Sequence, residues 1–219
     1  FATFGGNLYF AAYDGIHGLE LWKSDGTTSG TVMVKDINSG SGNSVIEMSP
    51  TVVGSTLFFN ANDGIHGDEL WKTDGTATGT VMVKDIRTRE PDYGVTKMIA
   101  VGDTLYFTVQ DNYHGVELWK SNGTANGTVM VKDINSGTGT SQPHSFATFG
   151  GNLYFAAYDG IHGHELWKSD GTETGTVMVE DVRVGSPTSS PSSLTIFGTA
   201  LYFSADDGEN GDELWKLSL

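Results

Sequence analysis

The chain has 219 residues, of which 37% are apolar, and its 12 basic and 27 acidic side chains give a net charge of −15. Such a charge repels phosphate groups, so it argues against nucleic acid as a partner and against an anionic membrane. The lack of cysteine excludes disulfides and thiolate chemistry, and no apolar run approaches the roughly 20 residues that a membrane helix needs.

The chain opens at Phe1 in the middle of a repeated pattern, with neither an initiator methionine nor a signal peptide. This start predicts a processed mature form or a fragment of a longer protein. We expect an extracellular or cell-surface location.

The motif Glu-Leu-Trp-Lys identifies five repeats, because it recurs at spacings of 49, 48, 48 and 48 residues. It contains all five tryptophans of the chain: Trp22, Trp71, Trp119, Trp167 and Trp215. The units span residues 1–50, 51–98, 99–145, 146–193 and 194–219, which we interpret as a single domain.

Each unit predicts four short strands, A to D, in a fixed order. In the first unit, an apolar segment and a glycine turn (1–6) precede an aromatic run (8–10), a loop (14–18), the motif strand (20–23) and, after an Asp-Gly-Thr loop, a strand over 32–37. Glycine-rich turns between short apolar runs are typical of β-hairpins.

Strands B and D are apolar at consecutive positions, so both of their faces must be covered. We therefore predict an all-β fold, a five-bladed β-propeller of antiparallel four-stranded blades. The fifth unit ends soon after its motif, so the last blade lacks its outermost strand and 19 strands are expected. An open edge there predicts self-association through blade five.

Residues 1–27 and 146–172 differ only at Leu19 and His164, an offset of 145 residues. Recent copying of a three-unit block explains this identity. Sameness among the repeats is therefore weak evidence for function.

The pattern ELW-x-x-DGT, as in Glu20 to Thr27, resembles the bacterial ELWxxDGT repeat proteins. Unit three has Asn122 in place of the aspartate, and unit five lacks the Asp-Gly-Thr triplet. The resemblance implies secreted or surface-exposed, propeller-like repeats, and it supplies no catalytic residues. We interpret the Asp-Gly-Thr loops as hairpin turns, with a polar rim as the alternative.

Strand polarity places the B–C loops and the D–A connections on one face. These loops repeat an aspartate, then a histidine or asparagine: Asp14, Asp63, Asp111, Asp159 and Asp207 with His17, His66, His114, His162 and Asn210. The aspartates either hold calcium or sugar hydroxyls or, in the interpretation that we favour, cap their own turns. Calcium needs 6–8 oxygens, so we expect no cofactor, with calcium as the lesser alternative.

Two further expectations concern the same loops. One histidine per loop, a blade apart, predicts no convergence on a transition metal. The glutamate that opens strand C, such as Glu20, has two open roles: it either helps the aspartate to hold calcium or sugar hydroxyls, or it accepts the indole N–H of a buried tryptophan.

Two positions that flank the loops vary between repeats. Tyr13, Asn62, Gln110, Tyr158 and Asp206 precede the aspartate, and Leu19, Asp68, Val116, His164 and Asp212 follow the last glycine. Exposed tyrosines can stack on sugar rings or simply cover the blade tops. The candidate ligand-binding residues are Tyr13, His17, Asn62, His66, Tyr113, His114, Tyr158, His162 and Asn210.

The chain contains no nucleophile elbow, phosphate-binding loop or HExxH motif. Unrepeated residues, among them His144, Arg87, Arg89 and Glu90, fall in predicted D–A loops. These observations predict a non-catalytic extracellular binding or adhesion module that takes a glycan or a cell-surface protein. The alternative is a building block of a surface layer or filament that assembles through the open blade edge.

Overall fold

The computed structural model describes residues 1–45, 49–86 and 94–218. Every regular element in these ranges is a β-strand. The described residues include no helix with the length and apolarity that a membrane crossing requires. Arg87, Arg89 and Glu90 lie outside the described residues.

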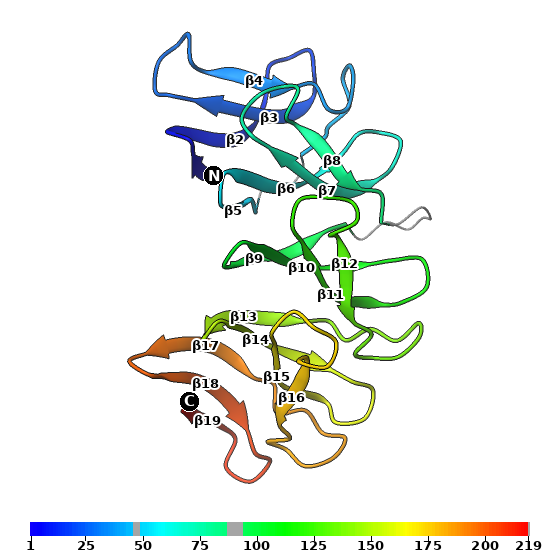
Figure 1. The fold of residues 1–219 in the computed structure, drawn as a ribbon, viewed down its shortest axis with the longest axis vertical. Helices are drawn as coiled ribbons and strands as arrows, with labels where there is room; N and C mark the ends of the chain where they lie inside the picture. Colours follow the sequence, from blue (N-terminus) through cyan, green and yellow to red (C-terminus); the bar gives the residue numbers. More distant parts are fainter. Residues whose placement is uncertain (46–48, 87–93, 219) are drawn as a thin grey trace. The chain divides into compact units, whose positions relative to one another are not determined.

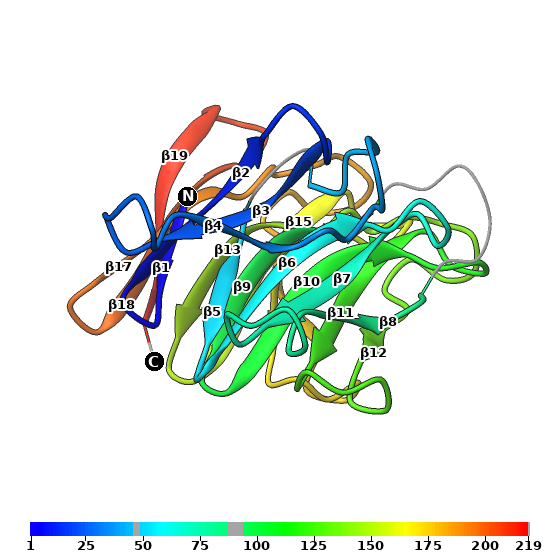
Figure 2. The same cartoon turned by 90° about the horizontal axis from the view of Figure 1, so that it is seen from above.

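The strands form five antiparallel sheets, each built from consecutive segments (Figures 1 and 2). In the first three sheets the strands are β1 (Ala2–Phe4), β2 (Asn7–Tyr13), β3 (Leu19–Ser24) and β4 (Val32–Lys35); β5 (Thr51–Val53), β6 (Thr56–Asn62), β7 (Asp68–Thr73) and β8 (Val81–Lys84); and β9 (Thr96–Val101), β10 (Thr104–Gln110), β11 (Val116–Ser121) and β12 (Val129–Lys132). In the last two they are β13 (His144–Phe149), β14 (Asn152–Tyr158), β15 (His164–Ser169) and β16 (Val177–Glu180); and β17 (Ser192–Phe197), β18 (Ala200–Asp206) and β19 (Asp212–Ser218).

This architecture confirms the predicted five-bladed propeller, with four blades of four strands and a last blade of three. The consecutive apolar residues of strand B are buried in blades two, three and four, as expected, whereas Leu8 of blade one is 39% exposed. In β6, Leu57, Phe58 and Phe59 are 0%, 3% and 1% exposed. Because neighbouring side chains on a strand point to opposite faces, both faces of this strand are covered. The same expectation was wrong for strand D, whose first valine is exposed in every four-stranded blade.

Two strand boundaries differ from the prediction. Strand D is shorter, since β4 ends at Lys35 rather than residue 37. Strand A is longer in the last three blades because a bulge extends it: the register shifts between His144 and Ala147, and Ser145 adopts φ of 56°. His144 is therefore the first residue of β13, not part of a connecting loop.

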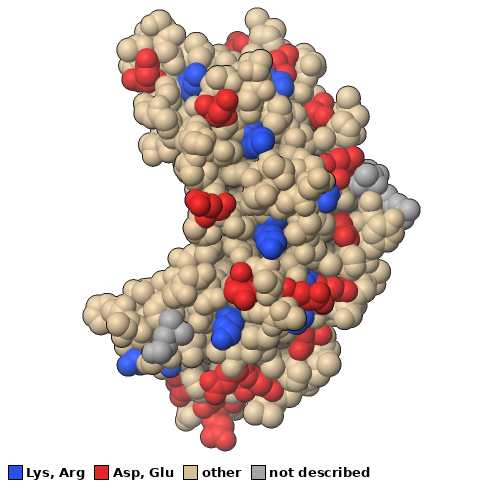
Figure 3. All heavy atoms as spheres, in the orientation of Figure 1, with Lys and Arg blue, Asp and Glu red and all other residues tan. Residues whose placement is uncertain are grey.

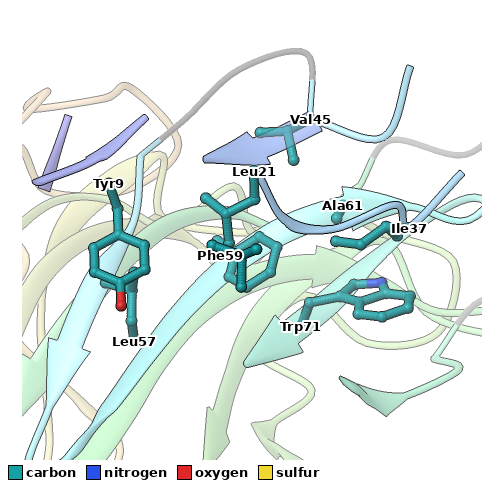
Figure 4. Packing of buried hydrophobic residues seen from close by; sticks show 9 residues of the cluster. Tyr9, Leu21, Ile37, Val45, Leu57, Phe59, Ala61 and Trp71 are labelled. Atoms are coloured by element: carbon teal, nitrogen blue, oxygen red, sulfur yellow. The ribbon is translucent and has the colours of Figure 1, made fainter. Parts of the chain in front are cut away.

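The chain divides into two compact units, residues 1–112 with 121–128 and residues 113–120 with 129–219, and the third sheet contributes strands to both. In the first unit, a buried cluster joins blades one and two (Figure 4). Tyr9 and Leu21 of blade one pack with Phe59 and Trp71 of blade two. In the second unit, Leu166 of β15 packs with Phe203 and Ala205 of β18.

Lysine side chains tie consecutive blades together within each unit. Motif lysines donate to a glycine carbonyl of the next Asp-Gly-Thr loop: Lys23 to Gly75 at 2.7 Å, Lys72 to Gly123 at 2.8 Å and Lys120 to Gly171 at 2.8 Å. Lysines that end strand D donate to a threonine carbonyl of the same loop: Lys35 to Thr80, Lys84 to Thr128 and Lys132 to Thr176. In blade four, strand D ends in Glu180 instead, and blade five has no such loop.

Candidate functional site

The B–C loop of blade one is closed by its own aspartate. Asp14 Oδ1 accepts the backbone N–H groups of Ile16 and His17 at 2.8 and 2.9 Å, and Asp14 Oδ2 lies 2.7 Å from His17 Nδ1. Gly15 has φ of 90°, a conformation that favours glycine. Both carboxylate oxygens are thus engaged inside the turn.

These contacts shift the protonation of both side chains. The backbone N–H of His17, its imidazole and the N–H of Ile16 lower the pKa of Asp14 to about 2. The hydrogen bond to Asp14 raises the pKa of His17 in return. At neutral pH the loop therefore carries an ionised aspartate.

The other blades repeat this turn with small changes. Asp63 and Asp159 hold His66 and His162 at 2.7 Å, while Asp207 holds Asn210 through the backbone N–H at 3.0 Å. In blade three, His114 Nε2 lies 4.0 Å from Asp133 Oδ2. The turn-capping interpretation accounts for the contacts in blades two, four and five. In the described part of the chain, no group of three or more histidine, aspartate or glutamate side chains is arranged to hold a metal ion.

Each of the first four B–C loops also exposes a large apolar side chain at its tip; the sequence-based interpretation named Tyr113 but missed the three isoleucines. Ile16, Ile65, Tyr113 and Ile161 are 68%, 82%, 69% and 65% exposed. In blades one, two and four the aspartate accepts the N–H of the tip residue itself, which fixes its backbone. The signal in the sequence was an apolar residue inside an otherwise polar turn motif.

In blade one the glutamate that opens strand C binds the D–A connection and not the indole of the motif tryptophan, since Trp22 Nε1 has no hydrogen-bond partner among the described residues. Glu20 is fully buried and accepts hydrogen bonds from the N–H groups of Ile37 and Asn38 and from Ser44 Oγ. It therefore fastens the D–A connection, whose backbone N–H groups need acceptors once buried. Glu117 and Glu165 repeat this role. Burial raises the pKa of Glu117 to about 7.

The two variable positions that flank each loop are cross-strand neighbours, as the pairs Tyr13–Leu19, Asn62–Asp68, Tyr158–His164 and Asp206–Asp212 show. Each such pair lies where strand B ends and strand C begins. Tyr13 is 64% exposed. In blade five, Asp206 also pairs with Arg183 at 2.7 Å. In blades one, two, four and five the structure thus places the two variable positions side by side.

The Asp-Gly-Thr loops are self-contained turns. Asp25 Oδ1 accepts the N–H and the hydroxyl of Thr27, and Thr27 Oγ1 accepts the N–H of Gly30. A Cβ on Gly30 would lie 2.0 Å from Asp25 Oδ1, so the second glycine of the motif is required by space. The same bonds recur around Asp74, Asn122 and Asp170.

Comparison with known proteins identifies the fold but no family. No family model matches the chain, and no curated protein matches it. Solved structures of peptidases are similar over almost the whole chain. A puromycin hydrolase mutant complexed with PGG has 15% identity and a TM-score of 0.60, and the match covers 97% of this chain and 34% of that one. A prolyl endopeptidase has 12% identity and a TM-score of 0.56, with 96% of this chain and 33% of that one covered. A puromycin-hydrolysing peptidase of Mycobacterium tuberculosis has 11% identity and a TM-score of 0.56, with 98% of this chain and 35% of that one covered.

The region of similarity in these enzymes is a β-propeller, and the present chain spans about a third of their length. This finding contradicts the prediction of a non-catalytic adhesion module and its surface-layer alternative, because the similar propellers belong to enzymes. The resemblance to ELWxxDGT repeat proteins extends only to a propeller-type fold.

Proposed function

We propose that this chain is the substrate-binding propeller of a peptide-hydrolysing enzyme. The observation that supports it is the similarity of 96–98% of the chain to peptidases at TM-scores of 0.56–0.60. In this proposal the chain binds the peptide, and bond cleavage belongs to a catalytic domain outside the 219 residues.

The B–C loops supply a surface with the chemistry for this role. Each compact unit presents two exposed apolar tips, Ile16 and Ile65 in the first and Tyr113 and Ile161 in the second. An aspartate stands two residues before each tip, and hydrogen bonds within the turn lower the pKa of Asp14, Asp63 and Asp159. A peptide that carries apolar and cationic side chains matches both groups.

The lysines do not neutralise these aspartates. Six of them donate to carbonyls of the Asp-Gly-Thr loops, at the other end of the strands from the B–C loops. On the face drawn in Figure 3, basic side chains are scattered among acidic ones, and the described residues there form no continuous basic patch. With a net charge of −15, the protein attracts a cationic peptide at long range.

Fluorescence anisotropy with labelled peptides tests the proposal. We expect the chain to bind a Lys- and Leu-containing peptide, more weakly as salt rises, and to bind its Glu-for-Lys counterpart at least tenfold more weakly. Mass spectrometry of the incubated peptide should show no cleavage. Equal affinity for both peptides, or none for either, would refute the proposed function, and cleavage would refute the assignment of catalysis to another domain.

Paired substitutions locate the surface. Ile16→Ser with Ile65→Ser, both in the first compact unit, should weaken peptide binding at least fivefold, because both tips of that unit are lost. The matched control is Val32→Ser with Val81→Ser, which alters side chains exposed by 39% and 36% on strand D, away from the B–C loops. Equal effects of the two pairs would contradict a binding role for the tips.

A further inference from the structure

Blade four carries a group of aromatic and imidazole side chains that the other repeats lack. His144 begins β13, Tyr158 ends β14 and His164 begins β15. His144 pairs with Ala156 and His164 with Tyr158, so the two histidines flank β14 near the same end of the blade. Their ring centroids lie 5.4 Å apart, and the Tyr158 ring lies 5.7 Å from that of His164.

His164 is also the one residue that distinguishes the segment 146–172 from its copy at 1–27. Residues 146–172 repeat residues 1–27 except that His164 replaces Leu19. The positions that correspond to His144 and His164 are Thr96 and Val116 in blade three and Ser192 and Asp212 in blade five. Both imidazoles therefore occur together in blade four alone.

We propose that His144 and His164 together bind one borderline transition-metal ion, such as Zn²⁺ or Ni²⁺. Two imidazoles that ligate one ion through bonds of about 2.1 Å at a tetrahedral angle have ring centroids about 5 Å apart. The observed separation of 5.4 Å matches this value. The sequence-based expectation that histidines cannot converge considered only the loop histidines, and neither ligand of this site is one of them.

The environment of each ring suits a ligand. His144 Nδ1 lies 3.0 Å from Ser145 Oγ, which orients the ring as the hydrogen-bond partners of metal-bound histidines do. His164 Nδ1 is buried and has no hydrogen-bond partner among the described residues, so a cation would satisfy its lone pair.

The composition of the site also predicts its selectivity. Nitrogen ligands favour zinc, nickel and copper over calcium and magnesium, which prefer oxygen. Since no third acidic or imidazole ligand joins the pair among the described residues, solvent or the Tyr158 hydroxyl would complete the coordination. We expect binding of moderate strength and one ion per chain.

Isothermal titration of tag-free, chelator-treated protein with NiCl₂ and ZnCl₂ tests the site. The expected result is one equivalent bound, no response to CaCl₂, and a rise in melting temperature of a few degrees. His164→Leu restores the residue found at Leu19, and His144→Thr that found at Thr96, so both suit the fold. Each should weaken binding at least tenfold.

His162→Asn is the matched control, because Asn210 occupies the equivalent loop position in blade five. It should leave the affinity unchanged. Undiminished binding in His164→Leu, or a stoichiometry of one ion per histidine-containing loop, would overturn the proposal. The titrations contain no peptide, so their outcome is independent of the proposed peptide binding.

Discussion

The Lys72 ammonium donates to the carbonyl of Gly123, 51 residues further along the chain, at 2.8 Å. The lysine belongs to the motif of one blade and the glycine to the Asp-Gly-Thr loop of the next. The two halves of the repeated signature, ELWK and DGT, are thus each other's partners across a blade boundary. Their recurrence in the sequence is explained by structure, without any role in binding.

Lys72→Met should remove this tie and lower the free energy of unfolding by about 1–2 kcal/mol, because a partly buried charged hydrogen bond is lost. Lys168→Met is the matched control, since blade five has no Asp-Gly-Thr loop for that lysine to reach. It should change stability by less than about 0.5 kcal/mol. Urea unfolding monitored by tryptophan fluorescence measures the free energy of unfolding of both variants. Equal losses would show that the hydrogen bond from Lys72 to Gly123 adds no stability of its own.

Trp119→Ala should destabilise the protein by about 3–5 kcal/mol, because it leaves a large cavity in place of a ring that is 7% exposed. Thermal and urea unfolding measure the loss. Tyr13→Ala serves as the surface control, with a side chain 64% exposed. A loss below about 1 kcal/mol for Trp119→Ala would show that the ring contributes little to packing.

Stability should fall as pH rises, through Glu117. The pKa of this carboxyl is raised from 4.5 to about 7 in the folded protein, so its protonated form favours the native state. That stabilisation is complete below pH 4.5 and is lost as pH rises to about 7, on the order of 3 kcal/mol. Melting temperatures between pH 4 and 8 should show the decline.

Glu117→Gln should make this decline shallower, because the amide does not titrate over the range. It should also lower stability at acidic pH, since the amide NH₂ replaces one oxygen that accepts hydrogen bonds from Ile134 and Ser141. Glu209→Gln, at an exposed loop position, should leave the slope as it is. An unchanged slope in Glu117→Gln would show that another group dominates.

Asp63→Ala should lower the pKa of His66, because the hydrogen bond from Asp63 is the main cause of its elevation. The backbone N–H groups of Ile65 and His66 lose their acceptor at the same time and should exchange faster with solvent. NMR titration and amide exchange measure these effects. Asp103→Ala, on a different loop, should alter neither the pKa of His66 nor the exchange of these amides. An unchanged His66 pKa and unchanged amide exchange in Asp63→Ala would rule out the turn-capping role of Asp63.

The fold was predictable because its determinants are local and repeated. The period of 48 residues, the glycine turns and the consecutive apolar residues of strand B each demand short strands covered on both faces. The role of Glu20 was not predictable in this way, because its partners Ile37, Asn38 and Ser44 lie 17 to 24 residues away on a connection without a pattern. Proximity to tryptophan in sequence was misleading there.

The candidate site was only half visible in the sequence. The variable positions could be named, but their pairing required the register that places Tyr158 opposite His164. The bulge at Ser145, which brings His144 onto strand β13, leaves no signature in the residue types. The single substitution of Leu19 by His164 between the copied segments was the one available signal.

The lysine ties also bear on how such a chain changes length. Blades two and three each carry a donor for the next blade and an acceptor for the preceding one, so a duplicated segment of this kind arrives with both connections already matched. The near-identity of residues 1–27 and 146–172 records one duplication. Glu180 ends strand D of blade four, where the first three blades have a lysine. In a molecule of this kind, gene duplication can add a whole blade, with its loops, without changing the packing inside the other blades.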